Sequence, residues 1–135
     1  MTINVRVDTA KLDSMEAGMV SRLSAIVRAH AFMVEGAAKT SIMTGTKSGR
    51  VYSRPNGKSH RASAPGEAPA TDKGFLVNSI RSAPEQGLTW RVSAGMGYAA
   101  PLELGSRRVA PRPFLAPALA SVKASFVKAI ERVFE

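Results

Sequence analysis

The chain has 135 residues and no cysteine, which leaves room for one domain and excludes disulfide bonds and cysteine-ligated metals. Nineteen basic against ten acidic residues give a net charge of +9, which favours contact with polyanions and carries no information on the fold. No run approaches the ~20 apolar residues of a membrane span, and the first residues lack the basic start and apolar core of a secretory signal, so no membrane contact is expected.

The N-terminal part of the chain is expected to form one strand and one long helix. Ile3, Val5 and Val7 alternate with polar residues, which is the period of a strand with one buried face. From Leu12 to Ile42 apolar residues recur every seven positions, which predicts a helix of about thirty residues, capped by Asp8 or Thr9 and laid across a sheet or a neighbouring subunit. Its apolar stripe comprises Leu12, Met19, Val20, Leu23, Ile26, Val27, Met33, Val34 and Ala37 or Ala38.

Residues 44–72 are rich in basic residues, glycine and proline. Apart from Val51 and Tyr52 they contain almost no apolar side chain, so this segment buries too little surface to fold alone. The run Arg54-Pro-Asn-Gly-Lys58 is a turn signal, because Asn-Gly readily takes positive φ. We therefore predict a single domain over residues 1–135, from which residues 44–72 project as an extended arm or a β-hairpin.

The second half of the chain is expected to complete a small antiparallel sheet and to add a second helix. Residues 73–80 suit a short helix or turn, and residues 79–84 and 88–93 suit two strands joined by a turn at 85–87. Apolar residues at three- and four-residue spacings then predict a C-terminal amphipathic helix with Leu119, Val122, Phe126, Ile130 and Val133 on one face. The fold class expected is α+β: a small antiparallel β-sheet packed by a long N-terminal helix and a C-terminal helix, with a long basic arm.

Prolines stiffen the segment that precedes the C-terminal helix. Pro111 and Pro113 fix their own φ and push the residues before them into extended conformations, so this strap is not helical. Pro117 suits the first turn of the helix that follows. Phe114 is thereby presented at a fixed angle to whatever the C-terminal helix packs against.

Glu103 precedes a basic turn in the same strap. Within one chain it is expected to pair with Arg107, Arg108 or Arg112, and such a surface ion pair is worth less than about 1 kcal/mol. The alternative is that these residues lie at a contact between subunits. The sequence alone leaves both interpretations open.

Side chains suited to catalysis or metal binding are sparse and scattered. His30 lies within the long helix, where a packing or interface role is expected, and His60 lies in the arm without a carboxylate nearby in the sequence. The ten acidic residues are scattered along the sequence, and no cluster of them stands out to hold a metal or to carry out acid–base chemistry. We therefore expect no enzymatic activity, cofactor, metal site or small-molecule substrate.

Three blocks of sequence resemble one family of phage proteins, in the same order. Residues 63–80 are similar to "Ala-Pro-x-Asp-Thr-Gly-x-Leu-x-x-Ser-Ile", residues 98–105 to "Tyr-Ala-x-x-x-Glu-x-Gly", and residues 111–118 to "Pro-x-Pro-Phe-Leu-x-Pro-Ala". These blocks are typical of the lambdoid phage gene-product-ten-like family, small neck proteins between the head connector and the tail. Asp72-Lys73-Gly74 departs from the family's Asp-Thr-Gly, which weakens the expected cap of the short helix.

The resemblance implies a structural virion protein of a tailed phage or of a prophage, assembled in the host cytoplasm, that joins or completes head and tail. It would form a homo-oligomeric ring, six-fold by analogy, that docks on the connector and tail proteins of the neck. A ring needs heterologous contacts, in which one patch of each subunit meets a different patch of the next.

Two segments supply candidate contacts. The arm would touch packaged DNA or a neighbouring subunit through Lys47, Arg50, Tyr52, Arg54, Lys58 and Arg61. The strap would form a subunit contact through Tyr98, Glu103, Gly105, Arg107, Arg108, Arg112 and Phe114. The alternative function is that of a small basic protein that binds nucleic acids without sequence preference.

Overall fold

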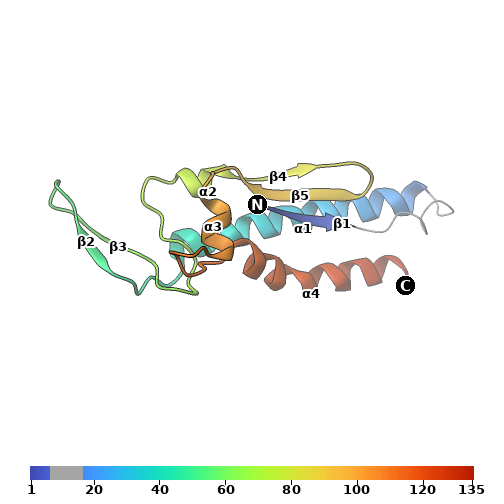
Figure 1. Cartoon of the computed structure of the whole chain (residues 1–135). Helices are drawn as coiled ribbons and strands as arrows, with labels where there is room; N and C mark the ends of the chain where they lie inside the picture. The colour runs from blue at the N-terminus through green and yellow to red at the C-terminus, as the bar shows by residue number, and fades with distance from the viewer. Residues whose placement is uncertain (7–16) are drawn as a thin grey trace.

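The computed structural model describes residues 1–6 and 17–135 and has the predicted α+β fold (Figure 1). Its elements are β1 (Thr2–Arg6), α1 (Ala17–Thr44), β2 (Val51–Ser53), β3 (Ser59–Arg61), α2 (Phe75–Ser79), β4 (Ile80–Pro84), β5 (Thr89–Ala94), α3 (Ala99–Leu104) and α4 (Leu115–Val133). The predictions for Val7, Asp8, Thr9 and Leu12 lie outside the described residues.

The main sheet has the strand order β1-β5-β4, and both pairings are antiparallel. The predicted turn between β4 and β5 is present, with Gly87 at φ 63° and the Glu85 N–H donating to the Thr89 carbonyl at 2.8 Å. Because side chains alternate along each strand, one face of the sheet gathers the apolar residues and turns them toward the helices. This inner face includes Ile3, Val5, Ile80, Trp90, Val92 and Ala94.

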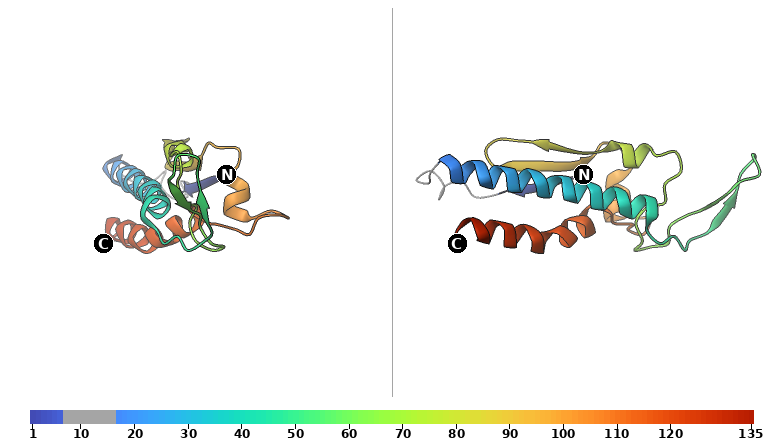
Figure 2. Two further views of the ribbon diagram at one scale, coloured as in Figure 1. Left: turned by 90° about the vertical axis from the view of Figure 1, so that its left-hand side faces the viewer. Right: turned by 180° about the vertical axis from the view of Figure 1, so that it is seen from behind.

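Helix α1 packs against β4, β5 and α4, and Figure 2 shows the two long helices running side by side along the molecule. The fully buried residues of α1 are Leu23, Val27, Ala31, Val34, Ala38 and Ile42. The predicted stripe is therefore only partly right. Met33, which was assigned to it, is 45% exposed, because the helix turns a neighbouring strip of its surface toward the sheet.

His30 joins α1 to α4 inside this packing and is 8% exposed. Its Nδ1–H donates to the Ile26 carbonyl at 2.8 Å, so in the neutral ring Nε2 accepts from the Ser125 hydroxyl at 3.2 Å. Its ring also meets the ring of Phe126 edge-on, with a centroid distance of 5.4 Å. The packing role expected for His30 agrees with these contacts.

Candidate interaction site

The middle of the arm is a β-hairpin that projects beyond one end of α1 (Figure 1). Its turn is closed by the Arg54 N–H, which donates to the Lys58 carbonyl, and by the Gly57 N–H, which donates to the Arg54 carbonyl. Gly57 has φ 76°, a conformation that favours glycine, whereas Asn56 keeps negative φ and accepts a hydrogen bond from the Lys58 N–H. All three residues of β2 are exposed, so the hairpin adds nothing to the core.

The register of the hairpin places most of its basic residues on one face of the ribbon. Tyr52 lies opposite His60, and the pairing of Ser53 with Ser59 continues into Arg54 and Lys58. Since side chains two apart on a strand and directly opposite on its partner share a face, one side of the ribbon carries most of the charge. We call this side the basic face; it comprises Arg50, Tyr52, Arg54, Lys58 and His60. The Arg50 guanidinium lies over the Tyr52 ring, 5.4 Å from its centroid, while Arg61 lies on the opposite face.

The two strands of the hairpin stay paired down to its root. The Gly49 N–H donates to the Ala62 carbonyl and the Ala62 N–H to the Arg50 carbonyl, both at 2.9 Å. A Cβ on Gly49 would come within 2.6 Å of the carbonyl oxygens of Ala62 and Ser63, so only glycine fits there. The two strands are therefore held in a defined register at the root.

The side chains of Glu67 and Lys47 make further hydrogen bonds at the root of the hairpin. Glu67 accepts hydrogen bonds from the Ser48 hydroxyl, the Ala64 N–H and the Ser48 N–H, which together lower the pKa of its carboxyl to about 2. The Lys47 amine donates to the Ser41 carbonyl at the end of α1 and to the Ala68 carbonyl. Lys47 was a candidate contact residue of the arm, and the structure gives its amine two partners within the chain.

Asp72 forms an ion pair with Arg54, with 2.5 Å between Oδ2 and Nη2. The hydrogen bond from Arg54 lowers the pKa of Asp72, and the charges of His60 and Lys73 act in the same direction. Both side chains of the pair remain partly exposed, at 32% for Arg54 and 44% for Asp72. The pair links the far end of the hairpin to the segment that leads into α2.

In the strap, Glu103 is buried and caps helix α4. Its Oε2 accepts from the N–H groups of Phe114 at 2.6 Å and Leu115 at 3.0 Å, and its Oε1 accepts from the Ala116 N–H at 2.7 Å. The expected ion pair of Glu103 with an arginine of the basic turn is therefore wrong. The carboxylate instead satisfies the free N–H groups of a helix N-terminus, where a negative charge is also favoured by the helix dipole.

Phe114 and Gly105 also have roles within the chain. Phe114 is 1% exposed and belongs to the main core, so its assignment to a subunit interface is corrected. Gly105 ends α3 at φ 79°, and a Cβ there would lie 2.9 Å from the ring of Pro111. Arg112 donates from Nε to the Ser63 carbonyl and from Nη1 to the Ala110 carbonyl, which ties the strap to the root of the hairpin.

The remaining strap candidates stay on the surface. Arg107 and Arg108 are exposed in the loop after α3, where the Ser106 hydroxyl accepts from the N–H groups of Arg108 and Val109. Tyr98 is 45% exposed at the start of α3. These residues, with the exposed Leu104 and Val109, remain available for contact with another molecule.

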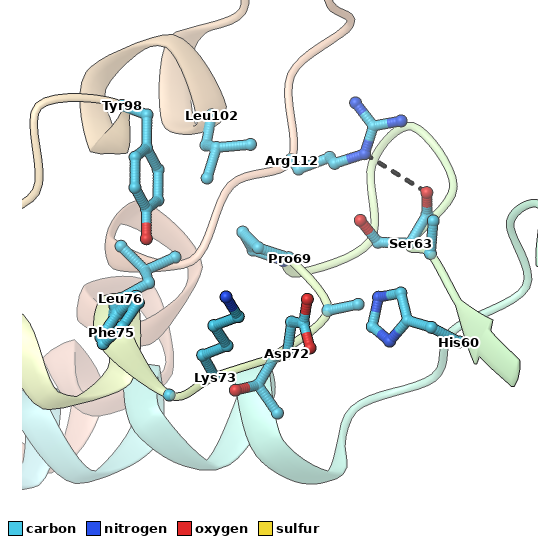
Figure 3. A pocket seen from close by; sticks show the side chains of 14 residues that line it. His60, Ser63, Pro69, Asp72, Lys73, Phe75, Leu76, Tyr98, Leu102 and Arg112 are labelled. Carbon is cyan, nitrogen blue, oxygen red and sulfur yellow. Dashed lines mark hydrogen bonds between the residues drawn. The ribbon is translucent and has the colours of Figure 1, made fainter. Parts of the chain in front are cut away.

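A cavity of about 390 Å³ lies where the hairpin root, the segment 69–76 and α3 meet. Figure 3 shows Tyr98 and Leu102 on one side of it, Asp72 and His60 on the other, and the hydrogen bond from Arg112 to Ser63 at its edge. Its walls mix apolar side chains with the basic groups of Lys73 and Arg112. In residues 1–6 and 17–135, no group of three or more His, Asp and Glu side chains is arranged to hold a metal ion.

Sequence reasoning missed two of the residues that organise this region, Glu67 and Asp72. Both carboxylates lie in the basic arm, and nothing local distinguishes them from a solvated acidic residue.

No helix in the described part of the chain combines the length and apolar character needed to cross a membrane. No protein-family model, curated protein or solved structure matches the chain.

Proposed function

We propose that the chain is a structural protein of the neck of a tailed phage, one subunit of a homo-oligomeric ring that joins or completes head and tail. The observation that supports the proposal is that the three sequence blocks that resemble the neck family meet in space. The Gly66 N–H donates to the Pro111 carbonyl at 2.9 Å, and Arg112 reaches the Ser63 carbonyl at 3.3 Å, which joins the first block to the third. Glu103 of the second block caps the helix that begins in the third.

The residues that carry the resemblance also have defined tasks in the fold. Glu103 caps α4, Gly105 makes room for Pro111, and Phe114 fills the core. Leu76 and Ile80 of the first block lie in the same core cluster as Phe114. A shared set of residues that builds one local unit is better support for a shared fold than three unconnected strings would be.

The loop after α3 offers an exposed patch for a heterologous contact around a ring, with Leu104 70% exposed and Val109 37% exposed beside Arg107 and Arg108. In a ring of copies, this loop of one subunit would pack against a different patch of the next, and six copies are proposed by analogy with the family.

Light scattering and negative-stain electron microscopy of the purified protein test this proposal. Closed rings of one size are expected, and Leu104→Ser combined with Val109→Ser should break them into monomers. Val127→Ser is the matched control, because Val127 is 43% exposed on α4, away from both the loop and the hairpin. A wild-type monomer at every protein concentration would overturn the ring, as would the absence of portal, connector and tail-tube genes beside its own.

The exposed hairpin favours a second candidate function, a small basic protein that binds nucleic acids without sequence preference and acts without forming a ring. Five basic residues between positions 47 and 61, with no acidic residue among them, are the observation behind it. Assembly separates the two candidates: rings support the neck protein, and a monomer that binds DNA tightly supports the alternative.

A further inference from the structure

The hairpin presents a positive charge that the rest of the chain does not balance. No Asp or Glu occurs between Glu35 and Glu67, and this stretch contains every basic residue of the hairpin. A solvated basic surface of this kind, projecting from the body, attracts polyanions over a longer range than any single contact.

A second copy of the chain offers little to neutralise this charge. Most carboxylates in the described residues are already engaged: Glu35 with Lys39, Glu85 with Arg91, Asp72 with Arg54, Glu67 with the hairpin root and Glu103 with α4. Glu131 in α4 and Glu135 after it form no ion pair within the described residues. Lys128 and Arg132 are close to both in the sequence, so the positive charge of these two residues offsets the two carboxylates. Charge complementarity therefore favours a partner from outside over another subunit.

We propose that the basic face of the hairpin binds the phosphate backbone of double-stranded DNA, and that Asp72 restrains this binding by holding Arg54. The choice of DNA as the polyanion rests on the proposed neck function, in which the ring surrounds the path of the genome. A two-stranded ribbon is narrow enough to enter the major groove, which is about 12 Å wide.

The geometry favours phosphate contact without base recognition. The Arg50 guanidinium lies over one face of the Tyr52 ring, and Tyr52 is the only Phe, Tyr or Trp residue of the hairpin, which leaves little aromatic surface for stacking on bases. Lys58 is exposed at the tip, and Arg50 at the other end of the basic face is exposed as well. Such charges neutralise phosphates regardless of sequence.

Arg54 is the group whose partner changes on binding. Its ion pair with Asp72 is at the surface, where such pairs are weak, so a phosphate oxygen can replace the carboxylate. Removing the negative charge of Asp72 should therefore strengthen DNA binding, whereas removing positive charges from the basic face should weaken it.

Fluorescence anisotropy with a labelled duplex of mixed sequence, titrated over a series of salt concentrations, tests the proposal. For Arg50→Gln with Lys58→Gln, we expect an affinity loss of about tenfold or more at low salt, and a slope of log K against log salt that is smaller by about 2. Lys123→Gln with Lys128→Gln is the matched control, since it removes the same charge from exposed positions on α4 and should change affinity by less than about twofold. Asp72→Asn should bind several-fold more tightly than the wild type.

Equal losses in the two double variants would overturn the hairpin site, and unchanged or weaker binding by Asp72→Asn would overturn the restraint. A competition experiment then tests the choice of DNA: polyglutamate and unlabelled duplex, at equal charge, are each added to the complex with labelled DNA. If polyglutamate displaced the labelled DNA as well as the unlabelled duplex does, an acidic protein surface would be as good a partner, and the choice of DNA would be overturned. Circular dichroism confirms that each variant is folded. Oligomeric state is measured in the same solutions, which separates the two proposals. If the protein forms rings but does not bind DNA, only the DNA-binding inference is rejected; if it binds DNA as a monomer, only the ring is rejected.

Discussion

The hairpin and the strap are both rich in glycine, proline and arginine, and the structure uses them in different ways. Most side chains of the hairpin point into solvent, and the hairpin is joined to the body at its root and through the ion pair of Arg54 with Asp72. The strap instead delivers Phe114, 1% exposed, into the core and brings the buried Glu103 to the start of α4. The comparison shows that the partners found within the fold, and not residue composition, separate a structural segment from a contact surface.

Two arginines of the strap, close together in the sequence, differ in burial and contacts in the same way. Arg112 donates to two backbone carbonyls and is half-buried, whereas Arg108 is exposed beside it in the sequence. The role of an arginine in this chain is therefore set by the contacts of its side chain and not by its charge alone. Substitutions in the two regions should accordingly have effects of very different size.

The largest effect is expected for Phe114→Ala, which should lower the free energy of unfolding by about 3–5 kcal/mol, because it leaves a cavity in the main core. A loss of 3 kcal/mol corresponds to a fall in Tm of about 10 °C or more. Arg108→Ala is the control from the same strap and should stay within about 0.5 kcal/mol of the wild type. Thermal melting followed by circular dichroism measures both, and equal Tm values for the two variants would contradict the contrast.

Glu103→Ala should be next, with a loss of about 2–4 kcal/mol, because three N–H groups at the start of α4 lose their acceptor and two of them are buried. Glu103→Gln should lose less, since an amide oxygen still accepts hydrogen bonds but carries no charge. Urea unfolding of the two variants gives the difference. If both matched the wild type, the cap would contribute nothing to stability.

Replacing residues 51–61 by Asn-Gly should change the free energy of unfolding by less than about 1 kcal/mol, because the strands are mostly exposed and the Arg54–Asp72 ion pair that it removes lies at the surface. Arg50 and Ala62 pair across the root, so a two-residue turn can join them. Deleting residues 44–70 is the comparison and should be more harmful, since it also removes Lys47, Glu67 and the buried Ser63. A cooperative melt near that of the wild type is expected for the first variant only.

The smallest effect is a pH dependence at the hairpin root. The pKa of Glu67 is lowered from 4.5 to about 2 in the folded chain, so the unfolded state binds its proton first as the pH falls. The stabilisation is therefore fully present above about pH 4.5 and is lost as the pH falls toward 2. The difference in Tm between the wild type and Glu67→Gln should shrink between pH 5 and pH 3, and a constant difference would contradict the assignment.

Periodicity was enough to predict the elements that carry the fold. The alternation of Ile3 and Val5 and the spacings along α4 each indicated the right structure, because both elements bury one face. Helix α3 was not predicted, since six residues are too few to show a helical period. Pro101 near its start and Gly105 just after its end were the signals that could have revealed it.

The organisation of the candidate site depended on contacts that no local pattern encodes. Glu103 caps a helix that begins eleven residues or more further along the chain, unlike the capping residues that sequence rules describe. The bonds of Lys47 to Ser41 and Ala68 join the two ends of the arm in the same way. Such contacts arise only when separate segments of the chain are brought together by folding.

The rigid root of the hairpin has a mechanical consequence. The Gly45 N–H and the Lys47 amine both bond to the Ser41 carbonyl in the last turn of α1, so the root is attached directly to the end of that helix. With 28 residues, α1 is roughly 42 Å long, and its last turn holds the hairpin root. A small tilt of α1 against the sheet would therefore carry the hairpin with it and move the tip near Asn56 further than the root.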